Sequence, residues 1–389
     1  MPFSQGSRSG LSYVAESTFG VTPGSPSLVQ LPFTTHSLDL TKERVTGNDI
    51  QPDRMLRTDR HGNRSASGDI VVDLRKGDYD PLLESAFMSA FADSATIATL
   101  TATGSAGVAT LTFATQTIPP YPVGSAITVA GMTPAGYNGT YTVTACTATS
   151  VSYANATTGA QIVAGTIKNK ALKIGVTPKS LSIEDAVNDL TVPQFRLFTG
   201  MTVNSVAISI KPNAMIGATF SLVGKDMAIS GTSVDPTKDA SSTNQPFDSY
   251  SGTIGIGNAS AVGGLTASTI ITGIDFTVSN SLAPTFVVGS STTPQLEYGM
   301  ATVEGTLTAY FEDASLINRF LNETTSAFQV TVNDPTGASN YTFHFPRVKF
   351  NGASVPVDNP TSRIITLPFV ALYDTLENTS VEIIRNPTV

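Results

Sequence analysis

The sequence predicts a mainly β protein with two short helices, and three observations support this class. Apolar and polar residues alternate along segments such as 203–210, 302–308 and 328–332, which is the period of a half-buried strand. Turn signals such as Asn138-Gly139 and Asn351-Gly352 separate these segments. Apolar residues follow a helical period at only two places, residues 79–91 and 314–322.

Each predicted helix has one apolar face and an acidic residue placed to cap its start. We expect Asp78 or Asp80 to cap the first helix and Asp313 to cap the second. The apolar faces consist of Leu82, Leu83, Ala86, Phe87 and Ala90 in the first helix, and of Leu316, Ile317, Phe320 and Leu321 in the second.

The strands before the two helices predict an internal duplication. Segments 37–40 and 67–74 precede the first helix, and segments 273–276 and 304–311 precede the second. Asp39 and Gly68 are 29 positions apart, and Asp275 and Gly305 are 30 apart. The predicted division is an N-terminal arm (1–30), a first repeat (31–92 and 169–232), an inserted domain (93–168), a linker (233–264), a second repeat (265–375) and a C-terminal arm (376–389).

The inserted domain is distinguished by its lack of charge. Residues 94–167 contain no Asp, Glu, Lys or Arg, yet they carry six strand-like segments of their own. About 75 residues suffice for a small Ig-like sandwich or a barrel, and exposed sites tolerate such insertions. The domain is either a decoration or a sugar-binding module, and the absence of Trp favours decoration.

The overall charge is low and acidic. Only 13% of the 389 residues are charged, whereas about a quarter is usual, and 22 basic against 30 acidic residues give a net charge of -8. A basic face that neutralises phosphates is therefore not expected. A protein that handles DNA without holding it remains compatible with this charge.

Charge is concentrated between residues 42 and 76, which hold eight of the 22 basic residues and six acids, with three more acids, Asp39, Asp78 and Asp80, directly beside the stretch. This stretch is either a solvated loop of mixed charge or a loop that pairs with complementary charges on another subunit. The second interpretation gives the candidate subunit contacts Arg44, Asp49, Asp53, Arg54, Arg57, Asp59, Arg60 and Arg64.

Catalytic and cofactor chemistry finds no support in the sequence. His36, His61 and His344 lack metal-ligand spacing, and each is expected at the surface or on an edge strand. No nucleophile elbow is present, and Gly255-Ile256-Gly257 lacks the third glycine of a dinucleotide loop. Cys146 is expected to be a buried small apolar residue. We therefore expect no catalytic residue, cofactor or metal.

No targeting or membrane segment is expected. The apolar runs are too short for a transmembrane helix, and MPFSQGSRSG lacks the apolar region of a secretory signal.

A series of ordered motifs resembles the major tail tube proteins of long, non-contractile-tailed bacteriophages. The resemblance covers most of the chain outside the insert. The motifs are ESTFGVTP (16–23), SIED (182–185), QFRLFTGMTVNS (194–205), GMATVEG (299–305), YFED (310–313), FPRVK (345–349) and FVALYD (369–374).

This resemblance implies two tandem tail-tube domains, each with packed antiparallel sheets and one short helix. Each domain would lend about four strands to a continuous barrel around a channel. A long loop would reach toward the next ring; residues 41–64 occupy its position in the first repeat and residues 279–295 in the second. Six domains usually surround such a channel, so a trimeric ring with pseudo-sixfold symmetry is favoured over a hexameric ring.

The resemblance also implies a function and partners. The chain would self-assemble into helically stacked rings, with the tape measure, tail terminator and distal tail proteins as partners and DNA passing through without specific binding. It would be assembled in the host cytoplasm and located in the virion, with no membrane partner. The alternatives are another virion surface component, such as a carbohydrate-binding tail decoration, and a secreted β hydrolase.

Three strand acids, Asp69, Asp73 and Glu304, are candidates to face the channel. The alternative is that they face outer solvent or pair with Arg. Like charge in the channel would disfavour contact with DNA phosphates within a Debye length of about 10 Å.

Overall fold

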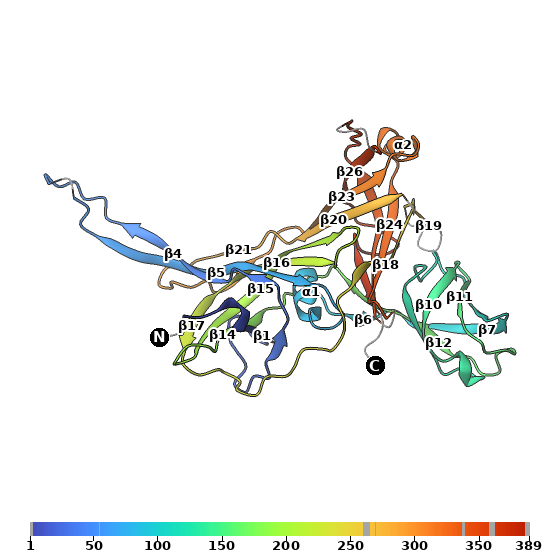
Figure 1. Ribbon diagram of the computed structural model, residues 1–389, viewed down its shortest axis with the longest axis horizontal. Helices are drawn as coiled ribbons and strands as arrows, with labels where there is room; N and C mark the ends of the chain where they lie inside the picture. The colour runs from blue at the N-terminus through green and yellow to red at the C-terminus, as the bar shows by residue number, and fades with distance from the viewer. Residues whose placement is uncertain are drawn as a thin grey trace.

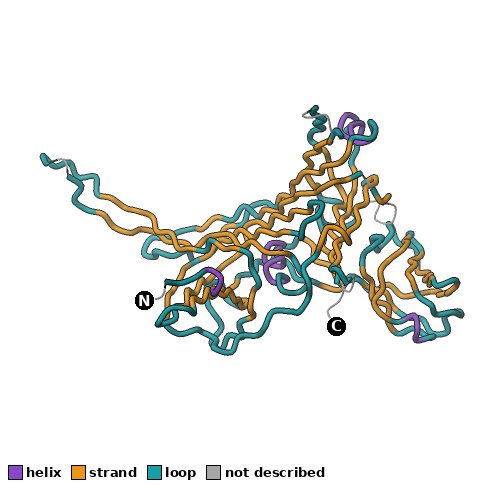
Figure 2. Tube along the Cα trace, in the orientation of Figure 1, coloured by secondary structure: helices purple, strands orange, loops and turns teal. Residues whose placement is uncertain are grey.

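The structure is a computed structural model that describes residues 3–53, 55–259, 265–268, 270–336, 339–357 and 362–385. It is mainly β, as predicted, with two α-helices among these residues. Figure 1 shows an elongated body with a thin hairpin projecting from one end and a small barrel at the other. The Cα trace in Figure 2 shows that strands make up most of the body and of the barrel.

Two sets of elements repeat in the same order. The first set is β4 (Asp39–Thr46), β5 (Asp59–Asp73), α1 (Asp80–Phe87), β14 (Leu181–Val187), β15 (Gln194–Ile210) and β16 (Gly217–Gly224). The second set is β20 (Ile271–Ser279), β23 (Thr302–Tyr310), α2 (Ser315–Leu321), β24 (Ser326–Asn333), β25 (Asn340–Phe350) and β26 (Ile364–Ala371).

The two sets also pair in the same way. In the first, β4 pairs with β5, β5 with β16, β16 with β15, and β15 with β14. In the second, β20 pairs with β23, β23 with β26, β26 with β25, and β25 with β24. This correspondence supports the proposal that the chain contains two repeats.

A glycine marks the same place in each set. A Cβ on Gly68 would lie 2.5 Å from the Ser37 carbonyl oxygen, and one on Gly305 would lie 2.4 Å from the Asp275 carbonyl oxygen. Both glycines therefore allow close approach of the preceding strand. They align Leu38 with Phe276, the residues that follow Ser37 and Asp275.

The two sets join in one continuous antiparallel sheet. The second half of β15 pairs with β16 on one side and with β20 on the other, from Ser205 opposite Ser279 to Ile210 opposite Ile274. The strand order is therefore β4, β5, β16, β15, β20, β23, β26 and β25. One face of this sheet covers a core that includes the contacting rings of Phe276, Phe328, Phe345 and Phe369.

Shorter elements extend the body. Those outside the barrel are η1 (Gly6–Arg8), β1 (Ser9–Ala15), β2 (Val29–Leu31), β3 (Thr35–His36), β6 (Ala92–Asp93), β13 (Lys170–Lys173), β17 (Asp226–Ser230), β18 (Asp248–Asn258), β19 (Thr266–Ala267), β21 (Ala283–Pro284), β22 (Leu296–Glu297) and β27 (Glu382–Arg385). Within the segment expected as a linker, β18 pairs with β24. Within the expected terminal arms, β1 pairs with β14 and β27 pairs with β13 and β25.

The motifs near the N-terminus and in β14 and β15 contain two groups of polar contacts. The Glu16 carboxylate accepts hydrogen bonds from the backbone N–H groups of Gly20 (2.7 Å) and Gly200 (2.8 Å), and from the hydroxyl of Ser182 (2.7 Å). Asp185 lies opposite Arg196 across the strand pair and receives its guanidinium. The charge-assisted bonds of Glu16 to Ser182 and Gly200 attach the N-terminal segment to the body.

Helix α1 ends four residues earlier than predicted, at Phe87, because Met88 adopts left-handed backbone with φ 49°. The predicted cap is wrong, since neither Asp78 nor Asp80 caps the helix with its side chain. Asp78 Oδ1 instead accepts the backbone N–H of Ser242 at 2.7 Å. The predicted apolar face is buried over Leu82, Leu83, Ala86 and Phe87, and each fully buried Leu or Phe contributes roughly 1.5–3 kcal/mol.

Helix α2 is less covered. Asp313 accepts the N–H of Ser315, the first helical residue, at 2.8 Å, but the N-cap position is Ala314, so the predicted cap lies one residue too early. Leu316 is buried, but Leu321, predicted on the same face, is exposed. The helix lies at one extremity of the body (Figure 1), where fewer elements pack against it.

The inserted segment folds into a closed six-stranded barrel, which confirms the barrel alternative and not the Ig-like sandwich. Its elements are β7 (Ile97–Ser105), β8 (Val108–Phe113), β9 (Ala126–Ala130), η2 (Ala135–Tyr137), β10 (Gly139–Cys146), β11 (Ser150–Ala154) and β12 (Thr166–Lys168). Closure removes every open strand edge, which suits a domain whose strands carry one charged residue, Lys168 at the end of β12, to protect an edge. Cys146 is buried as expected, and burial raises the pKa of its thiol to about 11.

The prediction that every histidine is at the surface or on an edge strand is wrong for His344. This residue lies in β25, which pairs with β24 and β27, and it is fully buried. Burial lowers the pKa of its imidazole, so the ring is neutral at pH 7.

We expect Gly68→Ala to destabilise the protein by about 1–3 kcal/mol, because the new Cβ would meet the Ser37 and Leu38 backbone at a φ of 150°. Gly217→Ala is the matched control, since no atom lies within 4 Å of a Cβ at that strand position. Urea unfolding monitored by circular dichroism measures both. Equal midpoints for the two variants would refute the close-approach role of Gly68.

Candidate functional site

One face of the continuous sheet is polar, and we call it the polar sheet face. Opposite residues in antiparallel strands point to the same side, so the strand register identifies its members. One row runs from Val71 through Thr219, Ala207 and Thr277 to Glu304. The next row runs as follows: Asp73, Gly217, Ser209, Asp275, Thr306 and Pro368.

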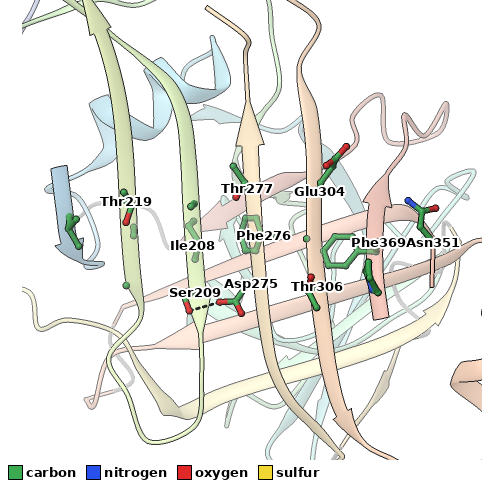
Figure 3. Close-up of a pocket in the computed structure, with 16 residues that line it drawn as sticks. Ile208, Ser209, Thr219, Asp275, Phe276, Thr277, Glu304, Thr306, Asn351 and Phe369 are labelled. Carbon is green, nitrogen blue, oxygen red and sulfur yellow. Dashed lines mark hydrogen bonds between the residues drawn. The ribbon is translucent and has the colours of Figure 1, made fainter. Parts of the chain in front are cut away.

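Four acids share this face. Asp69, opposite Ser221, joins Asp73, Asp275 and Glu304, so the structure brings together all three acids singled out in the sequence. Asp275 was missed, although it alternates with the buried Ile274 and Phe276 and that period places it outward. Figure 3 shows Ser209, Asp275, Thr306 and Glu304 along this face, over a shallow recess of about 640 Å³.

Little positive charge offsets the acids of the recess. Asp275 accepts a hydrogen bond from Ser209, and the ammonium group of Lys211 lies 3.6 Å from Asp275 Oδ1. Lys211 is largely exposed, so this pair is weak. The residues that line the recess include Asp275 and Glu304 but no Lys or Arg.

The second candidate region is the β4–β5 hairpin, which we call the arm (Figures 1 and 2). The sequence predicted a loop over residues 41–64, whereas the strands continue to Thr46 and resume at Asp59, so only residues 47–58 form the tip. The strands of the arm have no apolar face, because the arm projects from the body and covers no core.

Some charges of the arm are satisfied within the chain. Arg44 Nε lies 2.8 Å from Asp59 Oδ1, and Arg57 pairs with Asp53. Both pairs are exposed and contribute about 0–1 kcal/mol each.

The remaining residues predicted to contact another subunit lie at different places along the arm. Arg64 lies at the base of the arm, and its Nη2 is 2.7 Å from Asp226 Oδ2 of the same chain. Asp49 and Arg60 are exposed and have no ion pair among the residues that the structure describes. Arg54 lies outside the described residues.

Exposed apolar side chains at the tip were missed by the sequence analysis. Ile50, Met55 and Leu56 are 97%, 67% and 56% exposed. In the sequence, the one feature that could have indicated them is the occurrence of apolar residues within an otherwise polar segment. Three exposed apolar side chains on a thin projection indicate a contact surface.

The corresponding segment of the second set does not project. Residues 280–297 lie over the base of the arm, where the N–H of Arg64 donates to the Ser291 carbonyl at 2.8 Å. Leu282 and Leu296 pack against Met88. The two segments at the same position of the repeats therefore have different structures.

Neither region contains a metal cluster: within the described parts of the chain, no three His, Cys, Asp or Glu side chains are grouped to hold an ion. Over the same residues, no helix is long and apolar enough to cross a membrane.

The chain matches the family described as phage tail tube protein over residues 6–371. It belongs to this family. The match includes both repeated sets, the arm and the barrel, and it makes the chain a structural component of a phage tail. The search of curated proteins finds no match.

We expect replacement of the tube protein's arm tip, residues 47–58, by Asn-Gly to leave the stability of the body within about 0.5 kcal/mol of wild type. An Asn-Gly turn closes a two-residue hairpin, and surface changes of this kind have small effects. Urea unfolding midpoints provide the measurement. A large drop in midpoint would show that the tip supports the fold.

Proposed function

We propose that this tail tube protein self-assembles into stacked rings that enclose the channel for the phage genome. The observation that carries the proposal is the continuous eight-strand sheet with one polar, acid-bearing face and one buried face. A sheet of this kind with open ends can close only by pairing with other copies.

The polar sheet face is proposed to line the channel. Helix α1 and the apolar core cover the opposite face, whereas residues of the polar face such as Asp69, Asp73 and Glu304 are exposed. Asp69, Asp73, Asp275 and Glu304 would repel DNA phosphates within about a Debye length. DNA would thus pass without adhering.

Each chain contributes two repeats, so three chains would close a ring of six related units. A trimeric ring with pseudo-sixfold symmetry is therefore favoured, and a ring of six chains is the alternative. Stacked rings would end at tail terminator and distal tail proteins and surround a tape measure protein. Assembly would take place in the host cytoplasm before incorporation into the virion.

The arm is proposed to connect successive rings. It is the longest projection of the body in Figure 1, and its tip exposes Ile50, Met55 and Leu56. Asp49 in the tip and Arg60 just beyond it have no ion pair within the described part of the chain. Burying three such side chains would contribute several kcal/mol, at roughly 1.5–3 kcal/mol each. The ion pairs of Arg44, Arg57 and Arg64 would chiefly hold the shape of the arm.

We expect purified wild-type protein to form long tubes in negative-stain micrographs. The arm-tip replacement should form rings but no tubes, because it removes the contact between rings and leaves the sheet intact. Tubes of normal length from this variant would contradict the role of the arm. Failure of the wild-type protein to assemble under any condition that nucleates tubes would contradict the proposed function.

The channel-facing role of Glu304 is tested by gold labelling. In a Cys146→Ser background, a Glu304→Cys variant labelled with a maleimide-gold cluster should place the gold inside the tube in electron micrographs. A Thr103→Cys variant is the matched control, since Thr103 is exposed on the barrel and should place gold outside. Gold on the outer surface for Glu304→Cys would overturn the orientation of the sheet.

A further inference from the structure

The pairing of β15 with β20 is a complete example of how two repeats join. Six consecutive residue pairs connect the strands, from Ser205 opposite Ser279 to Ile210 opposite Ile274. The ladder continues where the N–H of Asn280 donates to the Asn204 carbonyl at 2.8 Å. A side-chain bond from Ser209 to Asp275 adds to it on the polar sheet face.

The same sheet has two open ends. The outer edge of β4 pairs with no strand among the described residues, since its one partner there is β5. At the other end, residues 351–357 continue from β25 along β26, through the Asn351 N–H to the Pro368 carbonyl and a bridge between Ser354 and Thr366. Their outer side likewise has no strand partner in the described part of the chain.

Strand partners show which residues of the two open ends correspond to the internal joint. Thr219 and Thr366 occupy equivalent places in β16 and β26, because their neighbours Phe220 and Leu367 lie opposite Ile70 and Leu307. Ser354, opposite Thr366, therefore corresponds to Ala207, which lies opposite Thr219.

Two positions further along β16 and β26, the correspondence continues. Asn351 bonds to Pro368 as Ser205 pairs with Ser221. On the other strand, the glycines that align Leu38 with Phe276 align Asp39 with Thr277 and Thr41 with Ser279.

We propose that the outer edge of β4 of a second copy of this chain pairs antiparallel with residues 351–357, in the register of the internal joint. Asn351 then lies opposite Thr41, and Ser354 lies opposite Asp39. The extra residue between Asn351 and Ser354 forms a bulge, as it does against β26, where Asn351 bonds to Pro368 and Ser354 to Thr366. This inference rests on the proposed ring assembly and specifies the contact that closes it.

Charge complementarity supports this register. Two positions beyond the pair of Thr41 and Asn351, Glu43 of one copy comes opposite Lys349 of the other. Both side chains are at the surface, and Lys349 meets Glu323 within its own chain at 2.7 Å, in a pair that is itself exposed.

An uncovered apolar groove supports the same occupant. At the internal joint, Leu282 is 9% exposed and packs with Val223 at the end of β16. The equivalent of Val223 is Val370, which lines a groove of about 620 Å³ together with the exposed Met300 and Tyr373. No charged residue lines this groove, and the exposed Val45 of the neighbouring β4 would reach it beyond Glu43.

The experiment is disulfide cross-linking between two singly substituted chains in a Cys146→Ser background. Thr41→Cys protein is mixed with Asn351→Cys protein, assembled and oxidised, and dimers are quantified on non-reducing gels. The control mixes Thr41→Cys with Thr366→Cys, one strand further into the sheet. Strands lie about 4.7–4.9 Å apart, and Thr366 also lies two residues along β26 from Pro368, the partner of Asn351. The control cysteines are therefore separated by about 12 Å, beyond disulfide reach.

We expect at least about tenfold more dimer from the Thr41 and Asn351 pair than from the control, because only the former falls within the reach of a disulfide. Rings visible in micrographs without this cross-link would overturn the proposed contact and leave ring assembly standing. Equal cross-linking in the control would also overturn the register. Absence of rings from unsubstituted protein would overturn the proposed function together with this contact.

Discussion

The rest of the structure depends on the backbone pairing between β15 and β20. This joint converts two sets of strands into one sheet, and it gives the sheet a single polar face and a single buried face. Backbone hydrogen bonds in a ladder fix the register, and a slip of one residue would turn every side chain to the other face. The common orientation of Asp69, Asp73, Asp275 and Glu304 follows from this register.

The segments that connect the first two strands of each set have different structures. Between β20 and β23, the connecting segment folds back and buries Leu282 and Leu296 against the first repeat. Between β4 and β5, it extends as the arm and leaves Ile50, Met55 and Leu56 exposed. The proposed duplication within one chain would allow this divergence, because only one of the two segments needs to make the internal contact.

Alternation predicted most strands and the buried face of α1 because both depend on local periodicity. It also placed Asp69, Asp73 and Glu304 on strands, although their common face needed the register between distant strands. The projecting hairpin of the arm and the burial of His344 were not predicted, and the sequence left the inserted domain open between a sandwich and a barrel, since each outcome depends on which elements lie alongside. Sequence composition identified the charged stretch of the arm but not its apolar tip, where three residues lack any period.

The central claim is that one chain supplies two equivalent parts of a ring through one continuous sheet. The most direct measurement is the symmetry of the assembled ring by cryo-electron microscopy. The account predicts three chains per ring, threefold symmetry and six similar sheet segments around the channel, joined alternately within and between chains. A ring of six chains with strict sixfold symmetry, or sheets separated at the joint of β15 and β20, would contradict it.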